Sequence, residues 1–262
     1  MTTVKDILTY IQTLAPAYMK ESWDNVGLLC GSSDAQVQKI LVALDPFEGV
    51  CREAAELGAD LIVTHHPLIF QPAKAITDET SIGRSILLLC RQGISAINAH
   101  TNLDCANGGV NTVLARTLGL ANIQVITPSG TDAEGEPWGL LRMGDFEAEL
   151  PDFLRHVKQA LACDGLRYVD GGKPVRKVAV GGGACAGGLR EAFDAGCDTF
   201  VTADVKYNQF WDARDLGMNL IDAGHFQTEN PVVAVLAGKL QAAFPEITVK
   251  ISETHRDCMK FY

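Results

Sequence analysis

A repeat within the chain constrains its fold more than any other feature of the sequence. Three segments of the first half recur without a gap at a constant offset of 138 residues (177 − 39): 39–42 (KILV) as 177–180 (KVAV), 52–54 (REA) as 190–192 (REA), and 63–64 (VT) as 201–202 (VT). The same offset aligns Asp60 with Asp198. Similarity at a fixed spacing indicates a duplicated structural unit. We therefore predict two related halves.

Each half has the pattern of strands that alternate with helices. Residues 3–6 (TVKD) resemble a capping box and precede an amphipathic stretch that reaches Pro16, which predicts an opening helix. Further along the first half, the sequence predicts strands at 39–44, 60–64, 95–100 and 123–127, and helices at 47–57, 81–92 and 109–118. This order indicates parallel sheets. We expect an α/β fold of two pseudo-symmetric αβ lobes, with sheets flanked by helices.

The residues between the two copies predict a connection with structure of its own. Residues 128–172 are rich in Gly, Asp and Glu at their start, and then place Leu154, Val157 and Leu161 on one face of a helix from about 151 to 161. The break between the lobes should fall here. The predicted organisation is a first αβ lobe at 1–127, a connecting excursion at 128–172, and a second αβ lobe at 173–262.

Charge and cysteine spacing exclude several classes of protein. A net charge of -10 argues against a protein that coats nucleic acid or an anionic membrane. The first twenty residues lack a signal-peptide pattern, and no apolar run is long enough to span a bilayer. The eight cysteines include no Cys-x-x-Cys pair, so structural zinc fingers are excluded and reduced, buried cysteines are expected. We expect a cytoplasmic protein without membrane or nucleic-acid partners.

Histidines and acids follow the predicted strands. His100 and Asp104 share a His-x-x-x-acid spacing with His225 and Glu229, and each pair follows a strand-like run. The pair 65–66 (HH) ends a third such run. Imidazoles and carboxylates hold catalytic metal ions, and the carboxyl ends of strands are where open α/β sheets collect ligands. The pattern predicts a two-metal site between the related halves.

Other interpretations of these residues remain open from the sequence. Neighbouring residues of a strand point to opposite faces, so His65 or His66 could be a hydrogen-bonded core residue. Asp104 could cap the helix that begins near Gly109, and the negative charge of Glu229 could interact favourably with the dipole of the following helix.

Three further features lack the context of a metal site. Residues 181–186 (GGGACA) fit a loose dinucleotide-binding pattern, but the matching turn at 43–45 (ALD) is not glycine-rich, so we predict no nucleotide-cofactor site there. His156 and His255 are predicted surface residues.

Five segments together carry a resemblance to a known family. They are 23–28 (WDNVGL), 63–67 (VTHHP), 98–104 (NAHTNLD), 181–183 (GGG) and 222–229 (DAGHFQTE), so the match runs nearly end to end. The chain resembles the NIF3-like (DUF34) family, also called GTP cyclohydrolase 1 type 2 homologs. This resemblance implies two similar α/β lobes, a dinuclear metal centre between them, and a toroidal homohexamer. Residues 128–172 are too short for the extra domain of longer relatives.

The resemblance also assigns roles to residues. It implies that the metal ligands are His65, His66, Asp104, His225 and Glu229, with His100 near the site. Glu229 is our candidate for a carboxylate that bridges both ions, and we take Glu229 and His100 as candidate catalytic residues. Nitrogen and oxygen ligands suit two divalent ions per chain, with zinc, manganese, iron and nickel all open.

Such a site predicts a metal-dependent hydrolase of a nucleotide or another phosphorylated small molecule. Opening of the GTP imidazole ring is the activity that the family name implies. Two alternatives remain open: a carrier of metal, or of a metal-containing ligand, without turnover, and an oligomeric interaction scaffold with a structural metal.

Overall fold

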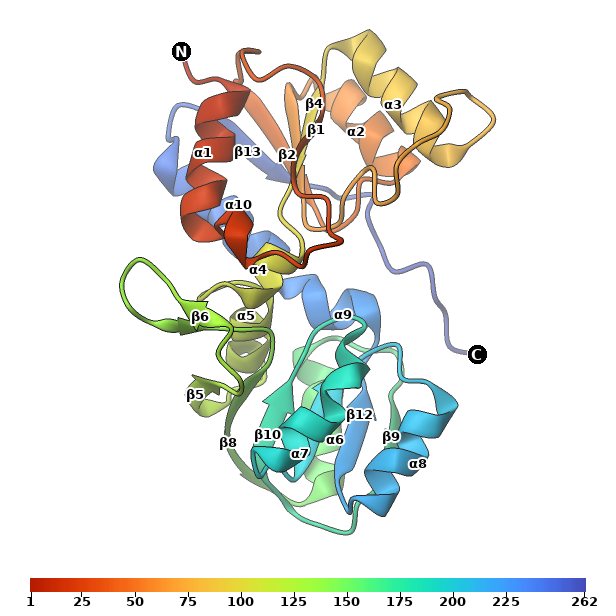
Figure 1. The fold of residues 1–262 in the computed structure, drawn as a ribbon. Coiled ribbons are helices and arrows are strands. Elements are labelled where there is room, and N and C mark those ends of the chain that lie inside the picture. Colours follow the sequence, from red (N-terminus) through yellow and green to blue (C-terminus); the bar gives the residue numbers. More distant parts are fainter. The chain divides into compact units, whose positions relative to one another are not determined.

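A computed structural model describes residues 1–262 and divides the chain into two compact units. Unit 1 contains residues 1–103 and 233–256, and unit 2 contains residues 104–232 and 257–262. None of the helices combines the length and the apolar character that crossing a membrane requires. Each unit is built around its own sheet (Figure 1).

The sheet of unit 1 has five strands in the order β1-β4-β3-β2-β13. Their bounds are Gly27–Cys30 (β1), Lys39–Ala43 (β2), Leu61–Thr64 (β3), Ser95–Asn98 (β4) and Thr248–Ile251 (β13). All neighbouring pairs are parallel except β1 with β4. Strands β3 and β4 are buried throughout, and this burial explains why β3 is apolar up to its last residue, Thr64.

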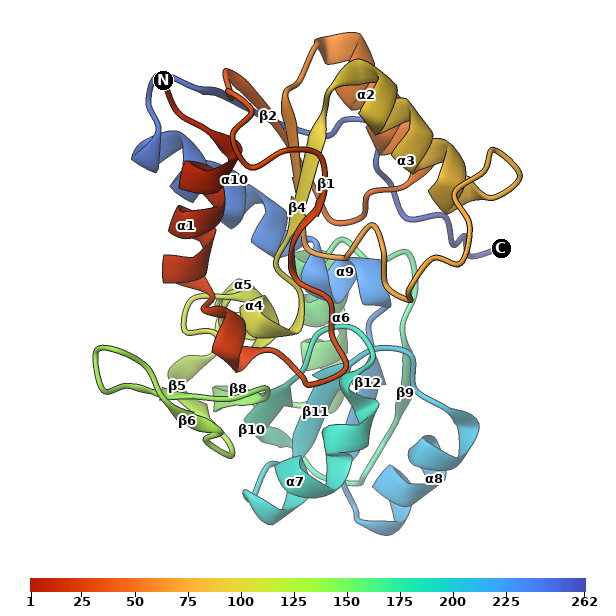
Figure 2. The same cartoon turned by 45° about the horizontal axis from the view of Figure 1, so that its top comes forward.

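Helices cover both faces of this sheet. Helices α1 (Val4–Leu14) and α10 (Pro231–Ala243) lie on one face, and α2 (Glu48–Leu57) and α3 (Ser81–Gln92) lie on the other (Figures 1 and 2). A short 3-10 helix, η1 (Ala17–Met19), follows α1. The predicted capping box is confirmed, because Thr3 and Asp6 exchange hydrogen bonds at the start of α1.

The sheet of unit 2 has six strands in the order β5-β8-β10-β11-β12-β9. Their bounds are Ala121–Val125 (β5), Arg142–Ala148 (β8), Arg167–Val169 (β9), Val175–Val180 (β10), Thr199–Thr202 (β11) and Asn219–Asp222 (β12). Strands β10, β11 and β12 are parallel, and the other pairings are antiparallel. A small hairpin, β6 (Gly130–Thr131) and β7 (Pro137–Trp138), stands apart from this sheet.

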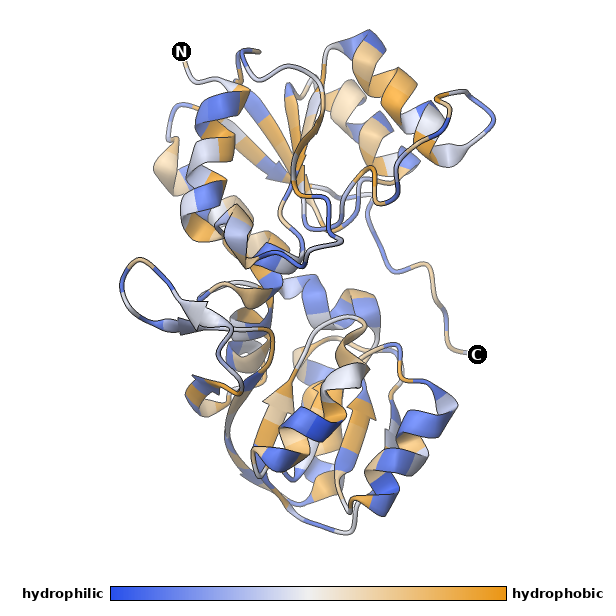
Figure 3. Ribbon diagram, in the orientation of Figure 1, coloured by the Kyte–Doolittle hydropathy of each residue, from blue (hydrophilic) through white to orange (hydrophobic).

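Apolar side chains from both faces of this second sheet pack under helices. One core cluster joins β10, β11 and β12 to α5 (Val110–Thr117) and α6 (Leu150–Ala160), and a second joins the same strands to α7 (Leu189–Asp194) and α8 (Tyr207–Asp215). Figure 3 shows hydrophobic residues along β10 and β12. The remaining elements are α4 (Thr101–Cys105), η2 (Cys185–Gly188) and α9 (His225–Glu229).

The predicted α/β class is confirmed, and the repeat has a matching hydrogen-bond pattern in both units. Asp60 accepts the backbone N–H groups of Gln38 and Lys39 at 2.8 and 2.9 Å. Asp198 accepts those of residues 176 and 177 at 2.9 and 2.8 Å. An aspartate at the equivalent position of each copy, Asp60 or Asp198, therefore fixes the start of the first parallel strand.

Three parts of the chain lie elsewhere than the sequence predicted. Residues 104–127, which the sequence placed in the first lobe at 1–127, belong to unit 2. Residues 128–172 contribute strands β8 and β9 to the second sheet, so they are more than a connecting excursion. Strand β13, which the sequence placed in the lobe at 173–262, pairs with β2 in unit 1. These results depend on tertiary contacts, which local patterns do not encode.

Candidate metal centre

Three histidines of unit 1 lie close together at the carboxyl ends of two strands. His65 and His66 follow β3 directly, and His100 lies between β4 and α4. Their ligand nitrogens all lie within 4.8 Å of one another. The adjacent histidines can face the same centre because β3 ends at Thr64, before strand geometry would turn them apart.

Each of these imidazoles is held by an acceptor at Nδ1. His65 donates to the carbonyl oxygen of Ala99 at 3.0 Å, His66 to Asp45 at 2.7 Å, and His100 to Asp24 at 2.8 Å. A carbonyl or carboxylate oxygen can only accept, so the proton lies on Nδ1 and the lone pair on Nε2. This is the usual arrangement of metal-ligating histidines, in which the partner fixes tautomer and ring orientation.

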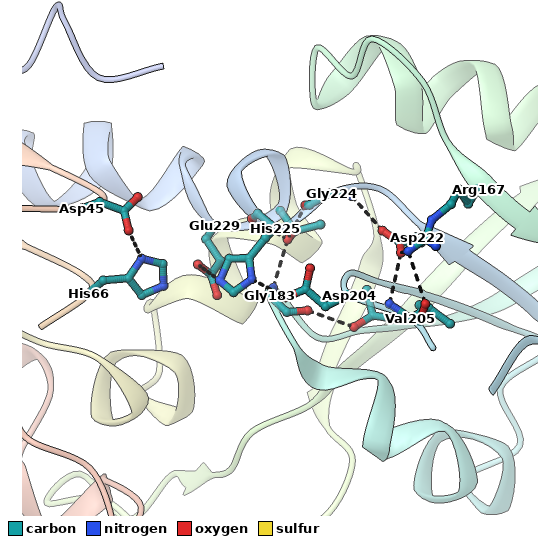
Figure 4. Close-up of polar contacts among 12 residues, drawn as sticks. Asp45, His66, Arg167, Gly183, Asp204, Val205, Asp222, Gly224, His225 and Glu229 are labelled. Atoms are coloured by element: carbon teal, nitrogen blue, oxygen red, sulfur yellow. Dashed lines mark hydrogen bonds and ion pairs between the residues drawn. The ribbon is translucent and has the colours of Figure 1, made fainter. Parts of the chain in front are cut away.

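The carboxylates that orient His100 and His66, those of Asp24 and Asp45, stay charged. Burial alone would raise the pKa of Asp24, but hydrogen bonds from His100 and Thr101 outweigh it and hold the pKa well below its usual range. The pKa of Asp45 is lowered in the same way, against the effect of burial, by hydrogen bonds from His255 and His66. Figure 4 shows the Asp45 and His66 pair.

Unit 2 supplies a second set of candidate ligands. His225 and Glu229 lie one turn apart on α9, with Nε2 and Oε2 separated by 3.0 Å, and Asp104 has a carboxylate oxygen within 4.8 Å of one of Glu229. The Nδ1 of His225 donates to Asp204 at 2.7 Å (Figure 4). His225 therefore presents Nε2 on the side of Glu229.

The glycine loop after β10 makes room for the Glu229 carboxylate. A Cβ atom on Gly183 would lie 2.0 Å from Oε1 of Glu229, and the φ of +60° at Gly183 also favours glycine. The N–H of Gly182 donates to Asn111 at 2.7 Å and that of Gly183 to Thr228 at 3.0 Å. Because these two N–H groups are bonded to side chains of the protein, the glycines are explained by the close approach of Glu229 and not by the binding of a dinucleotide.

Comparison with known proteins identifies the family of this chain. A model of the Duf34/NIF3 (NGG1p interacting factor 3) family matches residues 2–258. This chain belongs to the Duf34/NIF3 family. A relative from Clostridium perfringens named "GTP cyclohydrolase 1 type 2 homolog" is 34% identical, and the match covers 98% of this chain and 99% of the relative. A Helicobacter pylori protein named "GTP cyclohydrolase 1 type 2" is 30% identical, over 95% of this chain and 96% of its own.

The structure of a family member is also known. A Bacillus cereus protein described as related to NIF3 has a TM-score of 0.93 and 27% identity, over 100% of this chain and 99% of that protein. The fold is therefore that of the Duf34/NIF3 family.

The donor set of this Duf34/NIF3 protein fits a divalent metal ion. It consists of imidazole nitrogens and carboxylate oxygens, and Asp104 and Glu229 are buried. The cap interpretation of Asp104 is not supported, because the N-cap of α5 is Gly109 and no side chain bonds there. Burial, together with the charges of Asp104 and Glu229, raises the pKa of Cys185 well above its usual value, so this thiol stays protonated.

Sequence reasoning missed the acceptors that orient the histidines. The repeat gave no signal for them, because Asp45 aligns with Gly183 and Asp204 aligns with His66 at the offset of 138 (183 − 45). His255 was predicted to be a surface residue, but its side chain is 7% exposed and binds Asp45 at 2.8 Å. Burial of that segment follows from the position of β13, which the sequence pattern did not reveal.

Proposed function

We propose that this protein is a metal-dependent hydrolase that acts on a nucleotide or another phosphorylated small molecule. Two divalent ions would be held by His65, His66, Asp104, His225 and Glu229. The observation that carries the proposal is the common state of the four histidines, including His100: each has Nδ1 bound to an oxygen acceptor and presents Nε2.

The charge of this ligand set suits hydrolysis. Three neutral imidazoles and two carboxylates leave two divalent ions with about two net positive charges. Ions in such a site supply a bound water whose pKa is lowered enough to give hydroxide near neutral pH. Zinc, manganese, iron and nickel all accept these nitrogen and oxygen donors.

The residues of the chain have separable roles in this proposal. Glu229 is buried and offers two carboxylate oxygens, so it is suited to bind both ions. His100 is oriented by Asp24, and its Nε2 is the atom that can accept or return a proton during the reaction. Glu229 and His100 are therefore the proposed catalytic residues.

The names of relatives guide the substrate class. Proteins named for GTP cyclohydrolase activity match this chain nearly end to end, so we include GTP among the first substrates to test. The proposed ions would also attract an anionic substrate to a chain whose net charge is -10.

The proposal extends to assembly, where the family resemblance implies a toroidal homohexamer. Native mass spectrometry of the full chain tests it: a mass of six chains is expected, and a monomer or dimer at micromolar concentration would contradict it.

Turnover of a nucleotide panel tests the hydrolase proposal. The metal-loaded protein should hydrolyse at least one nucleotide, and His65→Ala and Glu229→Ala should abolish turnover while retaining the circular dichroism spectrum of a folded α/β protein. Asp194→Ala, an exposed acid on α7, serves as the control and should remain active. Tight metal binding without turnover across the panel would instead favour a metal carrier.

A further inference from the structure

Unit 2 contains a cavity beside β9, the edge strand of its sheet. A cavity of about 280 Å³ is lined by residues of β9 and α8, which lie side by side (Figure 1): Arg167, Tyr168, Val169, Phe210, Trp211 and Arg214. Its size is at the lower end of small-molecule sites. The lining residues include two arginines, three aromatic residues and no acid.

Both arginines are stacked on aromatic rings. The guanidinium carbon of Arg167 lies 5.5 Å from the ring centre of Phe210, and that of Arg214 lies 5.3 Å from the ring of Trp211. Stacking occupies the faces of the guanidinium groups and leaves the N–H groups at their edges for an acceptor. Tyr168 and Trp211 are about half exposed, so their rings can still meet a ligand.

The positive charge here is unevenly compensated. Arg167 donates through Nη2 to the carbonyl oxygen of Val205 and to the buried carboxylate of Asp222, which offsets its charge. Asp212 and Asp215 of α8 line a different cavity, together with Arg190. The charge of Arg214 is therefore the one that a ligand in this pocket would neutralise.

We propose that this pocket binds an aromatic anion of the nucleotide class. The phosphate would accept hydrogen bonds from Arg214 and from the Nε and Nη1 groups of Arg167, and the base would stack on Trp211 or Tyr168. Charged hydrogen bonds give the phosphate its affinity, and ring stacking gives selectivity for an aromatic ligand over a bare anion.

Arg167 connects the pocket with the candidate metal ligands of unit 2 through Asp222. Besides Arg167, the Asp222 carboxylate accepts the N–H of Val205 at 3.1 Å and that of Gly224 at 3.1 Å (Figure 4). Val205 follows Asp204, which accepts the hydrogen bond from His225. Gly224 is the N-cap of α9, and His225 is the first residue of that helix. A ligand that holds Arg167 in place would stabilise the position of His225. This second part rests on the proposed function, and it predicts that the nucleotide tightens metal binding.

Calorimetric titration of the metal-free full chain tests the pocket itself. The probes are AMP, GMP, adenosine and inorganic phosphate. The two nucleotides should bind, whereas adenosine and phosphate should bind at least about tenfold more weakly. Arg214→Ala and Trp211→Ala should each weaken AMP binding by about tenfold or more.

A matched control is available on α7. Arg190 also stacks on a phenylalanine ring, Phe193, at 5.6 Å, but lies outside the pocket. Arg190→Ala should leave AMP binding unchanged. The pocket proposal is overturned if neither nucleotide binds, if Arg214→Ala binds as wild type does, or if Arg190→Ala weakens binding equally. It is also overturned if substitution of Arg214 changes only the oligomeric state.

Zinc titration with and without saturating AMP tests the connection. AMP should tighten zinc binding at least about fivefold, and Arg167→Met should remove this effect. Equal zinc affinity in both titrations would overturn the connection alone. Absence of zinc binding in both would instead contradict the proposed function, and the metal-free titrations would still decide whether the pocket binds nucleotides.

Discussion

At the scale of single residues, the site depends on groups that hold the candidate ligands in place. Gly183 and Asp204 illustrate the two ways in which this happens: one leaves space for a carboxylate, and the other orients an imidazole. Substitutions at these positions test the geometry without removing a ligand.

Gly183→Ala should damage both stability and metal binding. The new Cβ would meet Oε1 of Glu229 at 2.0 Å in a left-handed backbone conformation, so we expect the free energy of unfolding to fall by about 2 kcal/mol or more. Metal affinity should fall as Glu229 is displaced. Gly187→Ala is the control, because a Cβ there meets no atom within 4 Å. Urea denaturation and metal titration measure both effects; equal behaviour of the two variants would refute the interpretation.

Asp204→Ala should weaken metal binding by about 10 to 100-fold, because His225 loses the acceptor that fixes its tautomer and orientation. Asp204→Asn should lose less, since an amide oxygen still accepts the Nδ1 proton, and Asn tolerates the φ of 52° at this position. A competitive chelator titration measures the affinities. Wild-type affinity in Asp204→Ala would show that this contact does not position His225.

Glu53 makes the stability of unit 1 depend on pH. This buried carboxylate accepts hydrogen bonds from Ser252, Glu253 and Thr254; they overcome the effect of burial and lower its pKa below the usual 4.5. A lowered pKa contributes stability that is present above pH 4.5 and is lost as the pH falls through the lower value. Glu53→Gln should cost about 1 to 3 kcal/mol at pH 7 and less at acidic pH.

Denaturation curves at several pH values check this result, with Glu56→Gln on the exposed face of α2 as the control. A difference between wild type and Glu53→Gln that stays constant down to pH 3 would contradict the assigned role.

At the scale of elements, the repeat predicts that equivalent residues of the two units contribute similarly to stability. Asp60 and Asp198 each accept two backbone N–H groups at the start of a parallel strand. Asp60→Ala and Asp198→Ala should therefore destabilise the protein by similar amounts, about 1 to 2 kcal/mol each. Thermal unfolding compares them. A large effect of only one substitution would show that the structural correspondence has no energetic counterpart.

The sequence predicted elements well where a local pattern was sufficient. The helix at 81–92 is α3, and the strand at 60–64 is β3 to within one residue. β8 was missed because the exposed polar residues Asp145 and Glu147 interrupt any apolar run in this strand. The antiparallel edges of both sheets also escaped the prediction, since pairing direction is decided by tertiary contacts.

The candidate ligands were predictable for a similar reason. His65, His66, His100 and His225 all lie within three residues of a strand end, and strand ends are visible in the sequence. Their partners come from other segments, such as Asp24, which lies 76 residues before His100. No local pattern links two such positions.

At the scale of the whole molecule, a chain of the Duf34/NIF3 family has two sheet-based units, each of which carries candidate metal ligands. If both ligand sets bind metal, removal of the ions should lower the melting temperature, because a ligand that binds only the folded state stabilises it. Differential scanning calorimetry before and after chelation measures this shift. An unchanged melting temperature would mean that the ions make no contribution to the folded state.

Metal content is the most direct test of the central claim. Elemental mass spectrometry of the gently purified, then reconstituted, full chain should find about two divalent ions per chain, and Glu229→Ala should lose most of them. The Asp194→Ala control should keep the wild-type content. Fewer than about one ion per chain in the wild-type protein, or an unchanged content in Glu229→Ala, would contradict the assignment of these residues as a metal centre.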